Sequence, residues 1–409
     1  MGSISQLIIK GHPILSLKNG YNHKVVNLLF TIKDLVNEAR SESDRNFKVW
    51  GDAYKKSKKI EKITSFKTTA RICKDRLSIF GISHSKAKNE YNKAIKNYVE
   101  SEKETYEQSK VKKEKSWIYS DTLPSFEDYT QTIKETINNP IINYEVLIDR
   151  ESNHENFKNY VLSRELIIDN LDIRIGLWII ISVLEGEDQI EYDINDVLKE
   201  GWINIDDVKN INNEKIILLT EGKTDTEFIS ACLKCNFNHI ENFYHFMDFN
   251  ASKYEANASR LAQTLKAFVG SGISNKIIAL FDNDTAGKKE LKTLKEVNFP
   301  KNIVAFSYPN IELAETYPTK GPSGEQILNV NGLAGSIELY LGEDCLKIDN
   351  RLTPILWSNY VKQLNAYQGS VMNKKQIQDK FRDKIKKNNG EVLSNELYLI
   401  IDAIMKAWI

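Results

Sequence analysis

Cysteine and histidine are scarce in this chain, which has four cysteines and six histidines among 409 residues. The cysteines are too few and too scattered for a disulfide framework, at Cys73, Cys232, Cys235 and Cys345. The single C-x-x-C motif lacks the second Cys or His pair that a zinc site needs. Because it lies on a predicted helix with apolar neighbours one turn away, we expect it to pack in the core. Metal or redox chemistry is the alternative.

Long apolar runs and a net charge are also missing. No stretch of about 18 apolar residues exists, so we expect no membrane-spanning helix. The first residues, Met1-Gly-Ser-Ile-Ser, have neither the basic nor the apolar region of a signal peptide, so we expect a cytoplasmic protein. The 56 basic and 56 acidic residues balance, and charge alone therefore indicates no partner. The length suggests two or three domains of roughly 150 residues each.

The first part of the chain, residues 1–140, is expected to form a mostly helical domain. Apolar residues recur with helical spacing from Val25 to Arg40, and a long polar helix is predicted from about Ser85 to Lys113. Two short strands precede these helices and are broken at Gly11 and Pro13.

The remaining chain is expected to fall into three regions. Residues 141–212 read as a mixed connecting region, in which Ile173 to Leu184 is a buried helix or strand too short to cross a bilayer. Residues 213–345 alternate apolar runs with helical segments, which is the rhythm of a parallel α/β sheet. Residues 346–409 return to predicted helices.

Acidic residues follow two of the apolar runs. Ile216 to Thr220 is followed by Glu221, and Ile277 to Phe281 is followed by Asp282-Asn-Asp284. Strands buried on both faces of a parallel sheet read as such continuous runs, and ligands gather beyond their carboxyl ends. Carboxylates placed there suit Mg²⁺ or Mn²⁺. The alternative is that these acids are solvated turn residues, because Asp and Asn are common in turns.

These motifs resemble a known domain. Glu221-Gly-Lys-Thr-Asp225, together with Asp282-Asn-Asp284 and the following Thr-Ala-Gly, resembles the Toprim domain of topoisomerases, primases and a group of nucleases. The head of the chain, its helical region and Gly335-Ser-Ile-Glu338-Leu-Tyr-Leu resemble bacterial proteins described as HEPN/Toprim-associated. The resemblance implies a Rossmann-like parallel sheet at 213–345, preceded by a helical domain and followed by C-terminal helices.

The resemblance also implies roles for the acids. It makes Glu221 a metal ligand or a general acid/base, and it makes Asp282 and Asp284 catalytic metal ligands. Nucleases of the OLD type, which are related, imply Asp225 as a further ligand and Glu338 as a downstream one. Two Mg²⁺ or Mn²⁺ ions would stabilise the attacking and leaving oxygens of a phosphodiester displacement. The implied function is a nuclease that cleaves DNA or RNA in bacterial defence against phage.

Several modules of neighbouring families are missing from the sequence. A phosphate-binding P-loop needs glycine at the position of Ile217, so no ATPase loop precedes Lys223. The sequence has no zinc module, which a primase would normally carry, and no cleavage domain of the kind found in topoisomerases. HEPN ribonucleases pair an Arg with a His at a spacing that Arg76 and His84 do not have. We therefore interpret the N-terminal half as a scaffold, dimerisation or sensing unit.

Lysines are the candidate nucleic-acid contacts. Two of them, Lys223 and Lys288, adjoin the acidic motifs. The others lie in the densest basic stretch of the chain and are Lys55, Lys58, Lys59 and Lys62. Solvated surface lysines are the alternative reading.

Two further expectations concern the whole protein. The main alternative to a nuclease is a protein that binds or senses nucleic acid or nucleotide through the metal without turnover. We also expect a homodimer, formed through the helical domain or the apolar tail Leu397 to Ile409.

Overall fold

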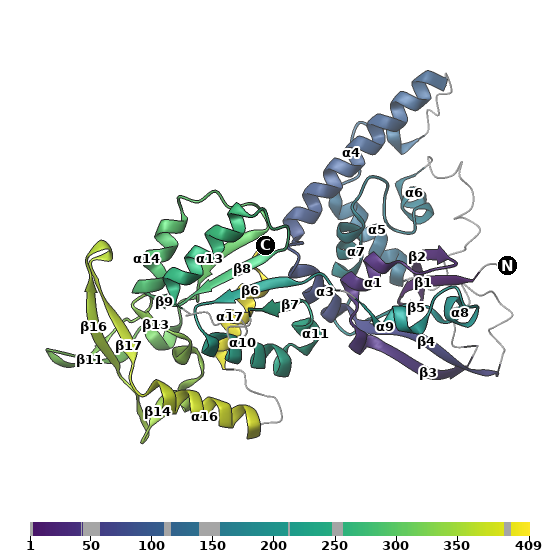
Figure 1. The fold of residues 1–409 in the computed structure, drawn as a ribbon. Coiled ribbons are helices and arrows are strands. Elements are labelled where there is room, and N and C mark those ends of the chain that lie inside the picture. The colour runs from purple at the N-terminus through teal and green to yellow at the C-terminus, as the bar shows by residue number, and fades with distance from the viewer. Residues whose placement is uncertain are drawn as a thin grey trace. The chain divides into compact units, whose positions relative to one another are not determined.

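The computed structural model describes residues 3–41, 43, 58–109, 116–138, 156–211, 213–247, 257–387 and 394–409. The chain divides into two compact units, which we call unit 1, Met1–Asn213 with Ile409, and unit 2, Glu214–Trp408. Figure 1 labels the elements of both.

Unit 1 is built on a five-stranded antiparallel sheet with the strand order β2-β1-β5-β4-β3. The strands are β1 (Ile4–Ile9), β2 (His12–Lys18), β3 (Leu35–Ser41), β4 (Ile60–Thr69) and β5 (Gln189–Asp193). The late strand β5 lies in the centre, between β1 and β4. Segments from both sides of the expected boundary at 140 thus form one sheet, and that boundary is wrong.

Helices complete unit 1. They are α1 (His23–Leu29), α3 (Ala70–Ser78), α4 (His84–Ser109), α5 (Phe126–Asn138), α6 (Phe157–Ser163), α7 (Ile173–Ser182), α8 (Asn195–Lys199) and α9 (Ile205–Lys209), with 3-10 turns η1 (Ile32–Asp34) and η4 (Trp117–Tyr119). The long helix α4 and the buried helix α7 confirm two predictions.

The predicted helix from Val25 to Arg40 is wrong in its second half. Helix α1 ends at Leu29, and Phe30 adopts an extended conformation. The turn η1 follows, in which the Asp34 side chain accepts a 2.6 Å hydrogen bond from the backbone N–H of Thr31. The chain then pairs with β4 as strand β3. Pairing between strands overrides a local helical pattern, because it satisfies the backbone of both segments.

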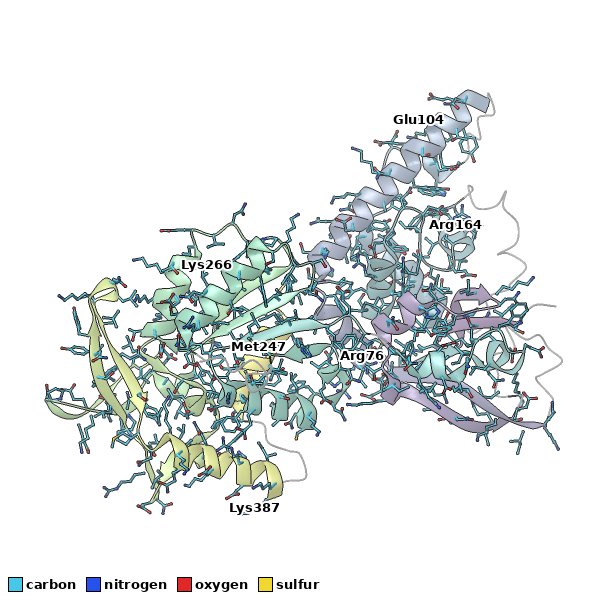
Figure 2. The ribbon with its side chains drawn as sticks, in the orientation of Figure 1. Arg76, Glu104, Arg164, Met247, Lys266 and Lys387 are labelled. Atoms are coloured by element: carbon cyan, nitrogen blue, oxygen red, sulfur yellow. The ribbon has the colours of Figure 1, made fainter. Side chains whose placement is uncertain are left out.

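A buried ion pair holds this turn. Arg76, on α3 and labelled in Figure 2, donates hydrogen bonds of 2.7 Å to both Asp34 Oδ2 and the carbonyl oxygen of Leu29. Its side chain is 1% exposed. A buried charge needs such partners, because an unpaired one would be strongly destabilising. Arg76 is therefore a structural residue and not a phosphate contact.

Unit 2 contains a four-stranded parallel sheet with the order β10-β8-β6-β7. Its strands are β6 (Ile216–Thr220), β7 (Tyr244–Phe246), β8 (Ile277–Phe281) and β10 (Ile303–Ser307), and its helices include α10 (Lys223–Asn236), α11 (Asn238–Glu241), α13 (Ala258–Gly270) and α14 (Thr285–Leu294). Figure 1 shows α13 and α14 on one side of this sheet and α10 on the other. All five residues of β8 are buried. The expected α/β fold with a parallel sheet is confirmed.

The rest of unit 2 is more β-rich than predicted. It contains β9 (Asn283–Asp284), η7 (Glu312–Ala314), β11 (Tyr317–Gly321), β12 (Gly324–Leu328), β13 (Ala334–Gly335), η8 (Ile337–Tyr340), α15 (Glu343–Leu346), β14 (Lys347–Ile348), β15 (Arg351–Leu352), β16 (Ile355–Val361), η9 (Lys362–Leu364), β17 (Ala366–Val371), α16 (Lys374–Lys387) and α17 (Asn395–Met405). Strands β12, β11, β16 and β17 form a second sheet. This sheet joins segments across the expected boundary at 345, so the prediction of a purely helical segment at 346–409 is wrong.

Two smaller expectations concern the core and the membrane. Cys232 is fully buried on α10 and is free, which confirms that it packs in the core. None of the described helices has the length and apolarity that crossing a bilayer requires.

Candidate functional site

Two neighbouring parallel strands place Glu221 and Asp282 side by side. Strands β6 and β8 pair directly, and each acid follows the last residue of its strand. The backbone N–H of Asp282 donates a 2.9 Å hydrogen bond to Glu221 Oε1. Because the carboxyl ends of parallel strands meet at one edge of the sheet, acids 61 residues apart become neighbours.

Asp284 serves as the N-cap of α14. Its Oδ1 accepts a 2.8 Å hydrogen bond from the N–H of Gly287, as N-cap carboxylates commonly do. A Cβ atom at position 287 would clash with the carbonyl oxygen of Asp282 and lie 3.2 Å from Glu221 Oε1. Glycine therefore allows α14 to begin this close to the acids.

The side chain of Gln368, on β17, forms hydrogen bonds with residues at the start of α14. Its Nε2 donates a 2.6 Å hydrogen bond to Asp284 Oδ2. Its Oε1 accepts hydrogen bonds from the hydroxyl of Thr285 and, at 3.1 Å, from the N–H of Ala286. Gln368 thus fixes the orientation of the Asp284 carboxylate.

Asp225 reaches the same region from the first turn of α10. That helix begins at Lys223 with Gly222 as its N-cap. The hydroxyl of Tyr308, the residue after β10, donates a 2.5 Å hydrogen bond to Asp225 Oδ1. Both Asp225 and Tyr308 are buried.

Glu338 lies in η8 and is held by three donors. Ser336 Oγ donates a 2.6 Å hydrogen bond to its Oε2, and Gln378 Nε2 donates a 2.8 Å hydrogen bond to its Oε1. Lys374 Nζ lies 3.3 Å from Oε2. Lys374 and Gln378 are one turn apart on α16, so a single helix face reaches this buried carboxylate.

The charges of the five acids act on one another. Burial raises the pKa of Asp282 well above its ordinary value, and the charges of Asp225, Glu221, Asp284 and Glu338 raise it further. Burial and neighbouring carboxylates, Asp284 and Asp225 among them, likewise raise the pKa of Glu221 to about 8. Burial, together with the charge of Glu338, raises the pKa of Asp225 to about 6. Such crowding of like charges is unfavourable unless positive charge is supplied.

Lys374 supplies one positive charge. Burial opposes ionisation of Glu338, but Lys374, Ser336 and Gln378 hold its pKa below the ordinary value. Burial also opposes the charge of Lys374, but Glu338, Asp282 and other acids raise its pKa overall. The pKa values of Asp282, Glu221 and Asp225 stay raised although Lys374 is present, so a further cation would favour the ionised forms of these acids.

The donor set fits a hard divalent cation. Carboxylate oxygens are the preferred ligands of Mg²⁺ and Mn²⁺, and Asp282 Oδ1 is a buried atom without a hydrogen-bond partner in the described part of the chain. As the side chains stand, however, no three His, Cys, Asp or Glu residues among those described are grouped to hold an ion. Protein donors engage Glu221 Oε1, Asp225 Oδ1 and both oxygens of Asp284.

The lysines proposed for nucleic-acid contact occupy two places. Lys223 and Lys288 are exposed in the first turns of α10 and α14, next to the acids. Lys58 and Lys59 lie just before β4 in unit 1 and Lys62 lies within it; Lys59 pairs with Glu61 at 2.7 Å. The remaining one, Lys55, lies outside the described residues.

Sequence reasoning missed four side chains that contact the acids: Tyr308, Gln368, Lys374 and Gln378. Tyr308 could have been found, because it directly follows a third strand of the parallel sheet. The other three come from a region in which only helices were expected. Lys374 begins a basic segment of the sequence, but no local pattern places any of the three beside the acids.

Comparison with protein families matches residues 1–215 to the HEPN/Toprim N-terminal domain 1 family. Searches among curated proteins and among solved structures found no match. The matched residues cover more than half of the chain and include the whole of unit 1 except Ile409. The family expected from the resemblance is therefore confirmed, and this chain belongs to the HEPN/Toprim N-terminal domain family.

Proposed function

We propose that unit 2 is a Toprim-type catalytic domain and that the protein is a Mg²⁺-dependent nuclease, active also with Mn²⁺, which hydrolyses phosphodiester bonds of DNA or RNA. One observation carries this proposal. Five acids from three separate segments share a mostly buried site at the carboxyl edge of a parallel sheet, and each raises the pKa of Asp282 or has its own pKa shifted there. A purely structural site would gain nothing from this repulsion.

Each side chain has a role that its contacts support. Asp282, Asp284, Asp225 and Glu338 would hold two ions, and Glu221 would act as a further ligand or as general acid/base. The ions, when bound, supply positive charge to the attacking and leaving oxygens of the phosphodiester.

Three other side chains would support these acids. Gln368 and Tyr308 orient Asp284 and Asp225 through the hydrogen bonds described above. Lys374 adds a fixed positive charge at the site, which suits a phosphate group. The exposed Lys223 and Lys288 would contact neighbouring phosphates of the substrate.

The test uses the full chain with plasmid, single-stranded DNA and total tRNA, each with Mg²⁺, Mn²⁺ or a chelator. We expect metal-dependent cleavage that falls at least about 100-fold in Glu221→Gln and Asp282→Asn, since a metal ion is worth several kcal/mol of transition-state stabilisation. Glu227→Gln is the matched control, because Glu227 is an exposed acid on the same helix that pairs with Arg382. Undiminished cleavage in both site variants would contradict the proposal.

A second candidate function is metal-dependent binding of nucleic acid or nucleotide without turnover. It is favoured by the hydrogen bonds that protein donors make to Glu221, Asp225 and Asp284, because these bonds hold the side chains in place. If no substrate yields a metal-dependent product while Mg²⁺ still stabilises the protein, the second function replaces the first.

Two further parts of the proposal concern the cell and the assembly. Defence against phage rests on the family resemblance, and phage plating on cells with the wild type or Glu221→Ala tests it: equal plating would contradict a catalytic role in defence. A homodimer is proposed for the assembly. Light scattering that gives one species of 47.0 kDa at all concentrations would contradict it.

A further inference from the structure

A groove of about 790 Å³ opens on unit 1 and is lined by residues of that unit. Its floor includes Asn37 on β3 and Thr64 on β4, which face each other in the sheet. Its wall includes Trp202 and Asn204, between α8 and α9. The volume lies in the range typical of small-molecule sites, about 300–1,000 Å³. Most of the lining residues are polar, which favours a ligand with both ring and polar groups.

Trp202 is held outward at the rim of this groove. Its side chain is 52% exposed, although tryptophan is one of the largest apolar side chains. The turn before it is set by Gly201, whose φ of 71° lies in the left-handed region that favours glycine after a helix end. The backbone N–H of Trp202 then donates a 2.9 Å hydrogen bond to the carbonyl oxygen of Val197. The backbone of Trp202 is thus fixed, while its side chain remains exposed to solvent.

The groove also presents a cation and amides. Lys62 is exposed beside it, and within the described residues it has no ion pair or hydrogen bond. Its neighbour Glu61 is occupied by Lys59 and Lys199, at 2.7 and 2.9 Å, and so does not neutralise Lys62. The amide of Asn37 is exposed on the same face of the sheet. The Lys62 ammonium can pair with a phosphate, and the amides can form hydrogen bonds with the polar edge of a base.

We infer that this groove binds an unpaired nucleotide of a DNA or RNA strand, with the base stacked on Trp202 and its phosphate on Lys62. A base in a duplex is already stacked on both faces, so an indole ring can only receive one that is unpaired. The amides of Asn37 and Asn204 would contact the base edge. The groove gives unit 1 a role in recognising single strands, which is separate from the proposed cleavage at the acidic site.

The test measures binding of fluorescein-labelled oligonucleotides to the full chain by anisotropy, in a chelator so that metal-dependent cleavage does not interfere. The probes are oligo-dT, oligo-U and a duplex of the same length. We expect Trp202→Ala to weaken single-strand binding about tenfold or more, and Trp202→Phe to keep most of it, because a stacked base is worth that much by alanine substitution. Lys62→Ala should lower the affinity and reduce the slope of its salt dependence by about one.

Matched controls come from exposed residues outside the groove. Lys18→Ala removes an exposed lysine from β2, and Tyr398→Ala removes an exposed aromatic ring from α17. Neither should change single-strand binding. Unchanged circular dichroism and unfolding midpoints would show that Trp202→Ala and Lys62→Ala are folded.

Three results would overturn the inference. They are absence of single-strand binding by the wild type, equal binding by Trp202→Ala and the wild type, and a change of oligomeric mass in Trp202→Ala, which would make the groove a contact between copies of the chain. The proposed nuclease function is judged separately, by cleavage in Mg²⁺ and its loss in Asp282→Asn. Binding that depends on Trp202 without any cleavage would support the groove and contradict the nuclease.

Discussion

The pKa values of two glutamates, Glu61 in unit 1 and Glu221 in unit 2, are shifted in opposite directions. In unit 1, hydrogen bonds from Lys59 and Lys199 lower the pKa of Glu61 to about 2. In unit 2, burial and neighbouring carboxylates raise the pKa of Glu221 to about 8. The chain as a whole has no net charge, so this difference is produced by folding alone. Local pairing with lysines keeps Glu61 ionised, whereas the crowded carboxylates around Glu221 fit the cation site that we propose for unit 2.

The largest effect should come from breaking the buried ion pair of unit 1. Arg76→Ala leaves Asp34 and the carbonyl oxygen of Leu29 without their donor, and we expect the free energy of unfolding to fall by about 3–5 kcal/mol. Denaturant unfolding measures it. The control is Arg71→Ala, because Arg71 has a side chain that is 61% exposed and pairs with Glu187, and its loss should cost under about 1 kcal/mol. Equal losses in the two variants would contradict the contrast.

Mg²⁺ binding at the acidic site should raise the stability of the protein, whereas loss of the Arg76 ion pair lowers it. Saturating Mg²⁺ is expected to raise the free energy of unfolding by about 2.7 kcal/mol at 100 times the dissociation constant, because only the folded chain gathers the acids. Calorimetry with and without Mg²⁺ measures it. The gain should be lost in Asp282→Asn and kept in Glu227→Gln. If Mg²⁺ leaves the wild type unchanged, the acids do not form a metal site.

A smaller effect is expected from the residue that orients Asp284. Gln368→Ala removes donors and acceptors that fix this carboxylate, and metal-dependent cleavage should fall about 10–100-fold, as for other residues that orient metal ligands. The Mg²⁺ concentration needed for half-maximal cleavage should rise with it. Gln363→Ala is the control, since Gln363 is exposed in η9 of the same hairpin. A loss of cleavage in both variants would indicate disruption of the hairpin instead.

The smallest effect should come from the matched glutamate of unit 1. Glu61→Gln is expected to lower the free energy of unfolding at pH 7 by about 0.5 kcal/mol, because its partners are largely exposed to solvent. The folded-state pKa is lowered, so the stabilisation is present above pH 4.5 and is lost as pH falls toward about 2. Unfolding curves of both proteins should therefore converge in acid. A difference that persists at pH 2 would exclude the lysine pairing as its cause.

Particular elements show how far the sequence could predict the structure. Ser125 with Asp128 three residues later is a capping-box pattern in the sequence, and at the start of α5 each of these side chains accepts a hydrogen bond from the backbone N–H of the other residue. The helix predicted to run to Arg40 failed, because its second half pairs with β4, which is distant in sequence. Strands β16 and β17 were missed for the same reason: their partner β11 lies before the expected boundary.

The sequence by itself determined that two buried strands end in acids, because strand burial and strand ends are local patterns. Only the tertiary structure decided which groups meet those acids. Tyr308 reaches Asp225 across 83 residues, and Gln368 reaches Asp284 across 84. Such contacts depend on the packing of whole segments, for which no spacing in the chain is a guide. The same packing brings Lys374, from a helix distant in sequence, to 3.3 Å from Glu338 Oε2.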